Sequence, residues 1–132
     1  MNSVQAINYF WNSFGWIAFD ENKVPIVDPR YNDDRKLIPP YITFDLVVDT
    51  FSHEVAMSAS LWARDSDTGI QTITQKMNEI KNYIGRGGII IKTDDGNVWI
   101  KRGRPFAQPM GDANDKSITR YVLNISAEYN EE

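Results

Sequence analysis

The sequence predicts a single α+β domain spanning residues 1–132, in which two main helices pack on one face of a mostly antiparallel β-sheet. Two observations predict this class. Apolar residues recur at steps of three and four in two stretches, and they alternate with polar residues in several others. The 132-residue chain is also 42% hydrophobic and 24% charged, a composition that supports one folded core.

Two stretches have the periodicity of amphipathic helices. In residues 3–14 one stripe contains Val4, Ile7, Trp11 and Phe14. In residues 67–84 the stripe contains Ile70, Ile73, Met77, Ile80 and Ile84. Asn2 or Ser3 can cap the first helix, and Ser66 or Asp67 the second. Glycines at 15 and 85 are expected to end them.

Five stretches are expected to form strands. Residues 41–51 and 53–65 alternate with period two, and their short connection predicts an antiparallel pair. Residues 89–92 and 98–101 flank the turn sequence TDDGN and predict a hairpin. The last strand is expected at residues 117–129.

Two segments show neither the helical nor the strand periodicity. Residues 20–40 contain four prolines and read as a long loop, which we interpret as a candidate contact arm with Asp33, Asp34 and Arg35 as candidate interface residues. Residues 102–112 are expected to form a second loop, within the stretch WIKRGRPFAQPMGD. The candidate interface residues of this loop and of the end of the strand before it are Trp99, Lys101, Arg102, Arg104, Phe106 and Met110.

Three interpretations of residues 99–112 are open. The cations and aromatic residues could stack on nucleic acid. Alternatively, Trp99 fills the core and the cations are solvated. A protein interface is the interpretation that the composition favours, because tryptophan, phenylalanine, methionine and arginine are enriched in interface cores.

Catalytic, cofactor and metal sites are not predicted. The chain has no cysteine, and its one histidine, His53, falls in a predicted turn. Carboxylate pairs at 20–21, 33–34 and 94–95 also fall in predicted turns, where aspartate is favoured for backbone reasons. The GRGG sequence at 85–88 follows a helix rather than opening one, so it is not a phosphate loop. A small metal-dependent hydrolase would require the pairs 33–34 and 94–95 to converge.

Charge and hydropathy exclude further classes. A net charge of −4 disfavours tight nucleic-acid binding. No apolar run approaches the ~18 residues that cross a bilayer, so no membrane contact is expected. The first ten residues lack the pattern of a signal peptide.

Four stretches, in order, resemble a known family. They are SVQAINYFWNSFG, PPYITFDLVVDTF, SASLWARDSD and GNVWIKRGRPFAQPMGDANDKSITRYVLNISAEY, and together they cover most of the chain outside residues 20–38. This combination resembles the tail terminator, or tail completion, proteins of long-tailed bacteriophages, which are also labelled minor capsid proteins. Residues 20–38 depart from the family pattern by forming a longer connection.

The resemblance implies a structural virion protein and no enzyme. The family forms a hexameric ring that caps the tail tube at its head-proximal end, stops tail polymerisation and joins the head connector or stopper protein. DNA passes through the lumen without specific binding, and assembly takes place in the host cytoplasm. Six chains carry −24 formal charges, which would favour DNA sliding if the acidic residues face the lumen. The alternatives are another head–tail joining protein, a tail tube protein or the hydrolase.

Overall fold

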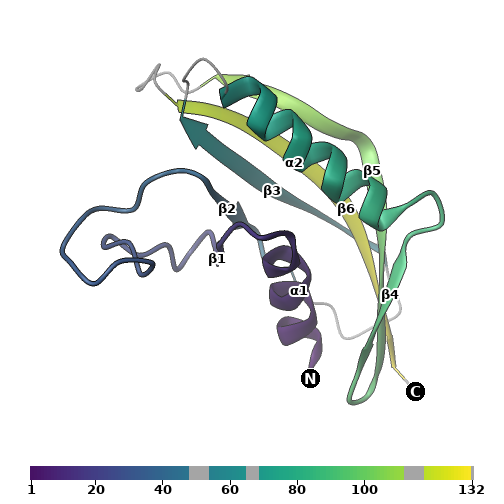
Figure 1. Cartoon of the computed structure of the whole chain (residues 1–132). Helices are drawn as coiled ribbons and strands as arrows, with labels where there is room; N and C mark the ends of the chain where they lie inside the picture. Colours follow the sequence, from purple (N-terminus) through teal and green to yellow (C-terminus); the bar gives the residue numbers. More distant parts are fainter. Residues whose placement is uncertain (48–53, 65–68, 112–117, 132) are drawn as a thin grey trace.

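The computed structural model describes residues 1–47, 54–64, 69–111 and 118–131 (Figure 1). The chain forms a single α+β domain with a curled six-stranded sheet and two helices, as the sequence predicts. The elements are α1 (Ser3–Trp11), the 3₁₀ turn η1 (Asn12–Phe14), β1 (Ala18–Asp20), β2 (Tyr41–Phe44), β3 (Glu54–Arg64), α2 (Gly69–Ile84), β4 (Ile89–Thr93), β5 (Gly96–Gly111) and β6 (Ile118–Glu131).

The strand order across the sheet is β1-β2-β3-β6-β5-β4. All neighbouring pairs are antiparallel except β1 and β2, which run parallel. The longest uninterrupted ladder joins β3 to β6, from Glu54 opposite Glu128 to Arg64 opposite Ile118. The parallel strand β1 was not expected, because three residues are too few to show a period.

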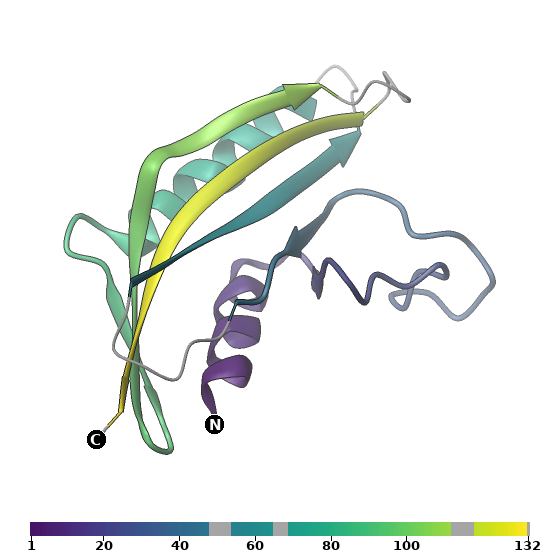
Figure 2. The ribbon, with the colours of Figure 1, turned by 180° about the vertical axis from the view of Figure 1, so that it is seen from behind.

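One face of the sheet is buried beneath both helices (Figures 1 and 2). Alternate strand residues point to this face, and the buried apolar ones join one cluster with the helices. Helix α2 packs on β3, β5 and β6, whereas α1 contacts β1 near one edge of the sheet and β4 and β5 near the other. The sheet therefore curls around a single core.

Helix α1 begins at a reciprocal cap. The side chain of Asn2 accepts from the Gln5 backbone N–H at 2.9 Å, and the Gln5 side chain accepts from the Asn2 N–H at 2.8 Å. Its buried residues are Ala6, Ile7, Phe10 and Trp11, followed by Phe14 in η1. Val4, expected in this stripe, is 41% exposed because it lies at the flank of the face that buries Ala6, Ile7, Phe10 and Trp11.

Helix α2 buries Ile73, Ile80 and Ile84, as its pattern predicts. Ile70 was expected in the same stripe but is 59% exposed, because it lies in the first turn of the helix, beyond the core cluster. Gly85 follows with φ of +70°, which ends the helix as expected. The predicted caps Ser66 and Asp67 lie outside the described residues.

Lys76 joins the two helical segments. Its ammonium group donates to the carbonyl oxygen of Phe14 at the end of η1 and pairs with Glu79 at 2.9 Å. Phe10 and Phe14 both contact the ring of Tyr83 near the end of α2, with ring centroids 6.3 and 5.3 Å apart. These contacts fix α2 against the N-terminal segment.

The expected strand 41–51 is shorter in the structure. Strand β2 ends at Phe44, and the carboxylate of Asp45 then accepts the Ser58 backbone N–H at 2.7 Å. A side chain thus replaces the backbone acceptor, and regular pairing stops there. The rest of the predicted strand from residue 48 onward lies outside the described residues, and so does His53.

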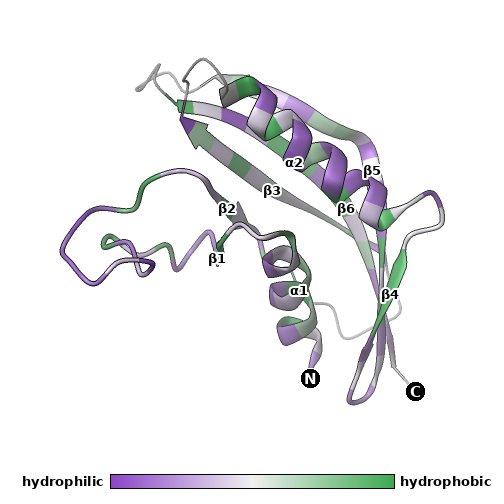
Figure 3. Cartoon of the chain, in the orientation of Figure 1, coloured by the Kyte–Doolittle hydropathy of each residue, from purple (hydrophilic) through white to green (hydrophobic). Residues whose placement is uncertain are grey.

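Figure 3 shows the polarity of the helices: the visible outer side of α2 is mostly hydrophilic. Its three fully buried isoleucines point to the sheet instead. Among the described residues, no helix is long and apolar enough to span a membrane.

Truncation of a buried residue of α2 is expected to destabilise the fold strongly. Ile80→Ala removes a fully buried side chain and should cost about 2–5 kcal/mol of unfolding free energy. Ile70→Ala, on the exposed side of the same helix, should stay within about 0.5 kcal/mol. Chemical denaturation of both variants measures the difference, and equal effects would contradict the assigned helix orientation.

Candidate contact surfaces

Residues 102–111 do not form the predicted loop, and residue 112 lies outside the described residues. Strand β5 continues to Gly111 and pairs with β6 on both sides of a bulge: Arg102 lies opposite Ile125, and Ala107 lies opposite Leu123. Four residues, 103–106, thus face a single residue of β6. Prolines at 105 and 109 are accommodated because no described strand pairs with the other edge of β5 beyond Ile100.

The strand conformation separates the side chains that the sequence placed together. Trp99 and Lys101 lie on the sheet face that carries no helix, since their neighbours Val98 and Ile100 are fully buried. Trp99 therefore does not fill the core, and its indole N–H donates to the Gly87 carbonyl at 2.9 Å. Arg102 lies on the helix-bearing face, where its Nε donates to the Lys81 carbonyl at 3.0 Å, near the end of α2.

Met110 belongs to a different part of the uncovered face. It lies opposite Arg120 on β6, which lies opposite Trp62 on β3, which lies opposite Tyr41 on β2. The guanidinium of Arg120 is 4.8 Å from the Trp62 ring centroid, and the Tyr41 and Trp62 rings stack with centroids 6.0 Å apart. This cross-strand row was not expected, because its members come from four distant parts of the sequence.

A basic groove of about 580 Å³ opens at the bulge of β5. We call it the bulge groove, and its lining includes Glu54, Arg86, Lys101, Arg102, Arg104 and Phe106. Lys101 pairs with Glu54 at 2.5 Å, and its ammonium group lies 4.3 Å from the Trp99 ring centroid. The hydrogen bond from Lys101 lowers the pKa of Glu54. Four cations and one carboxylate leave the lining positively charged.

Gly103 allows β5 and β6 to approach closely at the bulge. A Cβ atom at this position would meet the backbone carbonyl carbon and oxygen of Asn124 at 2.8 Å. The Asn124 side chain in turn donates to the Pro105 carbonyl at 2.9 Å. Glycine and asparagine therefore hold the backbone that shapes the groove.

The other edge of the sheet offers few free backbone groups. At β1, the Ala18 N–H donates to the Asn12 side chain at 3.0 Å, and the Asp20 carbonyl accepts the Lys23 N–H at 2.8 Å. The outer portion of β5 is therefore the longer open edge in the described part of the sheet.

Residues 21–40 form an arm that projects from the body (Figures 1 and 2). As the sequence predicts, this segment contains no helix or regular strand. Its two halves are joined by the bridge between Val27 and Lys36. The Asp28 N–H donates to the Arg35 carbonyl at 2.9 Å, and the Leu37 N–H donates to the Ile26 carbonyl at 3.2 Å. The arm thus has a defined shape.

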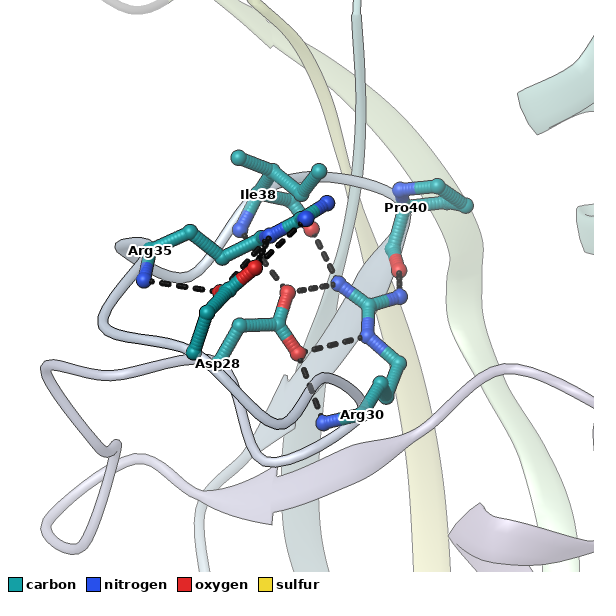
Figure 4. A network of polar contacts seen from close by, with 6 residues as sticks. Asp28, Arg30, Arg35, Ile38 and Pro40 are labelled. Carbon is teal, nitrogen blue, oxygen red and sulfur yellow. Dashed lines mark hydrogen bonds and ion pairs between the residues drawn. The ribbon is translucent and has the colours of Figure 1, made fainter.

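A buried ion pair organises the arm (Figure 4). Asp28 is fully buried and accepts from Arg30 Nε at 2.9 Å, from Arg30 Nη2 at 2.6 Å and from the Ile38 N–H at 3.3 Å. Arg30 also donates to the carbonyls of Ile38 and Pro40. The hydrogen bond from Arg30 holds the pKa of Asp28 well below its usual range, so the carboxylate stays charged.

The candidate residues Asp33, Asp34 and Arg35 lie on this arm, away from β5 (Figure 1). Arg35 pairs with Asp33 at 2.6 Å, and its guanidinium lies 3.9 Å from the Tyr31 ring centroid. Asp34 is exposed and has no ion pair to any residue that the structure describes. Large apolar side chains are also exposed here: Ile26 is 82% exposed and Val27 46%.

Asp28, Arg30 and Arg86 are the residues that sequence reasoning missed. Asp28 and Arg30 read as ordinary polar loop residues, and only the spacing of an acid and a base two residues apart hinted at a local pair. Arg86 sits in the GRGG stretch that ends α2, and no local signal connects it to β5.

The convergence needed for a metal-dependent hydrolase is not observed. Asp33 and Asp34 lie on the arm, whereas Asp94 and Asp95 lie at the turn between β4 and β5, and Asp94 pairs with the N-terminal ammonium at 2.7 Å. In the described ranges, no three histidine, cysteine, aspartate or glutamate side chains are placed to hold a metal ion.

Comparisons with protein-family models, with curated proteins and with solved structures return no match for this chain.

Loss of the buried ion pair is expected to unfold the arm without unfolding the body. Asp28→Asn leaves Arg30 without its carboxylate, so trypsin should cut within the arm faster, while the global denaturation midpoint changes little. Asp33→Asn, at the exposed pair with Arg35, is the matched control and should have a much smaller effect. Equal cleavage rates in the two variants would contradict the role given to Asp28.

Lowering the pH should weaken the ion pair that holds the arm. The folded pKa of Asp28 lies below the ordinary value of 3.8, so its contribution is complete above that pH and is lost as the pH falls through the folded pKa. Hydrogen exchange of the Ile38 amide, corrected for intrinsic rates, should show full protection from neutral pH down to about pH 4 and a progressive decline below it, toward the folded pKa of Asp28. Loss of protection above pH 5 would contradict this assignment.

Substitution of Gly103 should distort the bulge. Gly103→Ala places a methyl group against the Asn124 backbone and should cost about 1–3 kcal/mol. Gly87→Ala, where nothing lies within 4 Å of the new methyl group, is the control and should be close to neutral. Thermal unfolding compares the two variants, and a neutral Gly103→Ala would show that the strands can separate freely there.

Proposed function

We propose that this chain is a structural virion protein of a long-tailed bacteriophage, a tail terminator that forms a ring. The ring caps the head-proximal end of the tail tube, stops tail polymerisation and joins the head connector or stopper protein. The sequence resemblance described above motivates the proposal. The protein then acts through contacts with copies of itself and with tail components, and it needs no cofactor or catalytic residue.

The observation that carries the proposal is the organised arm. Ile26 and Val27 expose adjacent apolar side chains, and the Asp28–Arg30 pair holds the segment that presents them in one shape. A preformed segment loses less conformational entropy on docking than a flexible one. This is the behaviour expected of an assembly contact.

The placement of the contact surfaces also supports a ring. A closed ring repeats one heterologous contact, so each subunit needs two different surfaces that face different neighbours. The arm and strand β5, whose bulge lines the groove, lie on opposite sides of the molecule in both views of the ribbon (Figures 1 and 2). The open edge of β5 adds backbone groups that a neighbouring chain can pair with.

The charge of the chain is compatible with a DNA conduit. Each subunit carries a net charge of −4, so a ring of six carries −24. Excess negative charge around a channel repels phosphate groups and lets a duplex pass without being held. The ring would be assembled in the host cytoplasm and remain in the virion at the top of the tail.

The mass of the purified protein in solution tests the proposal. Light scattering at two concentrations and two salt strengths should give six times the chain mass of 15.2 kDa, and electron microscopy should show closed rings. Helical tubes would instead support a tail tube protein. A monomer at high concentration that also fails to bind tail tubes would overturn the proposal.

A further inference from the structure

We propose that the arm of one copy docks into the bulge groove of the next copy, so that this contact, repeated around the ring, is the subunit interface. The inference rests on the proposed function, which it deepens by assigning the partner of each surface.

The groove carries positive charge that the described structure does not neutralise. Glu54 is already paired with Lys101, and Arg102 is committed through Nε to a carbonyl of α2. Arg86 and Arg104 are exposed and form no ion pair with any described residue. Phe106, half-buried against the core, adds an apolar wall. The groove therefore fits a segment that offers both carboxylate and apolar groups.

The arm offers this chemistry. Two of its carboxylates, Asp28 and Asp33, are occupied by arginines of the arm itself. Asp34 is exposed and has no such partner among the described residues, so we assign it to Arg104, whose guanidinium can bind a carboxylate through two N–H groups. Ile26, the most exposed large apolar residue described, is assigned to the wall formed by Phe106.

A second copy is the occupant that the geometry favours. The arm projects on the side of the body away from strand β5, which lines the groove of the same chain (Figures 1 and 2). In a ring of identical chains, every arm meets a groove and every groove receives an arm. A nucleic-acid duplex fits less well, because its charges extend along the whole axis, whereas these cations are confined to one pocket that contains Glu54.

Cysteine crosslinking tests the contact directly, because the chain contains no cysteine. In the double variant Ile26→Cys, Phe106→Cys, mild oxidation should give a ladder of covalent oligomers on a non-reducing gel. Each single variant can give dimers at most. The matched control combines Ile26→Cys with Ile70→Cys, which is an exposed site in the first turn of α2. This variant should give no ladder.

A charge exchange tests the assigned ion pair independently. Arg104→Glu and Asp34→Arg should each weaken assembly by about ten-fold or more, because each places like charges together. The two substitutions combined should restore assembly to near its original strength. Arg64→Glu, an exposed arginine at the end of β3, is the control and should leave assembly unchanged.

The outcomes separate this inference from the proposed function. Rings that persist with Arg104→Glu, and that give no ladder with the cysteine pair, overturn the arm–groove contact and leave the ring intact. A ladder from open chains without closed rings supports the contact and counts against a terminator. If the cysteine pair gives no ladder and the combined charge exchange does not restore assembly, the contact is overturned. Loss of assembly on adding a short DNA duplex would instead assign the groove to phosphate binding.

Discussion

The ladder between β3 and β6 is the constraint on which the other elements depend. Its residues alternate strictly, so that Met57, Ala59 and Leu61 on β3 meet Ile125, Leu123 and Tyr121 on β6 across the buried face. Helix α2 covers this centre, and β2 and β5 are hydrogen-bonded to its two sides. Because a slip of one residue would exchange the buried and exposed faces, the ladder fixes the position of every other strand.

The arm follows a different physical rule from the body. The body is held by burial of apolar side chains, whereas the arm is held by one buried carboxylate and the guanidinium that surrounds it. An ion pair of this kind gives a defined shape more than it gives stability. That suits a segment whose apolar residues, such as Ile26, must remain available to a partner.

The sequence predicted the helices and the inward faces of β3 and β6 because their periods are regular, and it predicted the β4–β5 hairpin from the turn residues between the two strands. It failed at β5, where Pro105 and Pro109 indicated a loop. Prolines are acceptable there because β4 pairs with β5 only as far as Ile100 and leaves an open edge beyond it. The sequence of β5 does not show where its neighbour β4 stops. The candidate residues were likewise hard to group from the sequence. Lys101 and Arg102 are adjacent in sequence but point to opposite faces of the sheet, and both line the bulge groove. Arg86 joins them there only because the fold brings it next to β5.

The bulge of β5 has a consequence for how such a chain can change over time. Pairing with β6 is regular up to Arg102 and resumes at Ala107, so the residues between them are outside the ladder. Insertions, deletions or replacements in this interval can alter the shape and charge of the groove without changing the register of either flank. A descendant of this chain can therefore acquire a new binding preference while keeping the same core, with Gly103 as the position least free to vary.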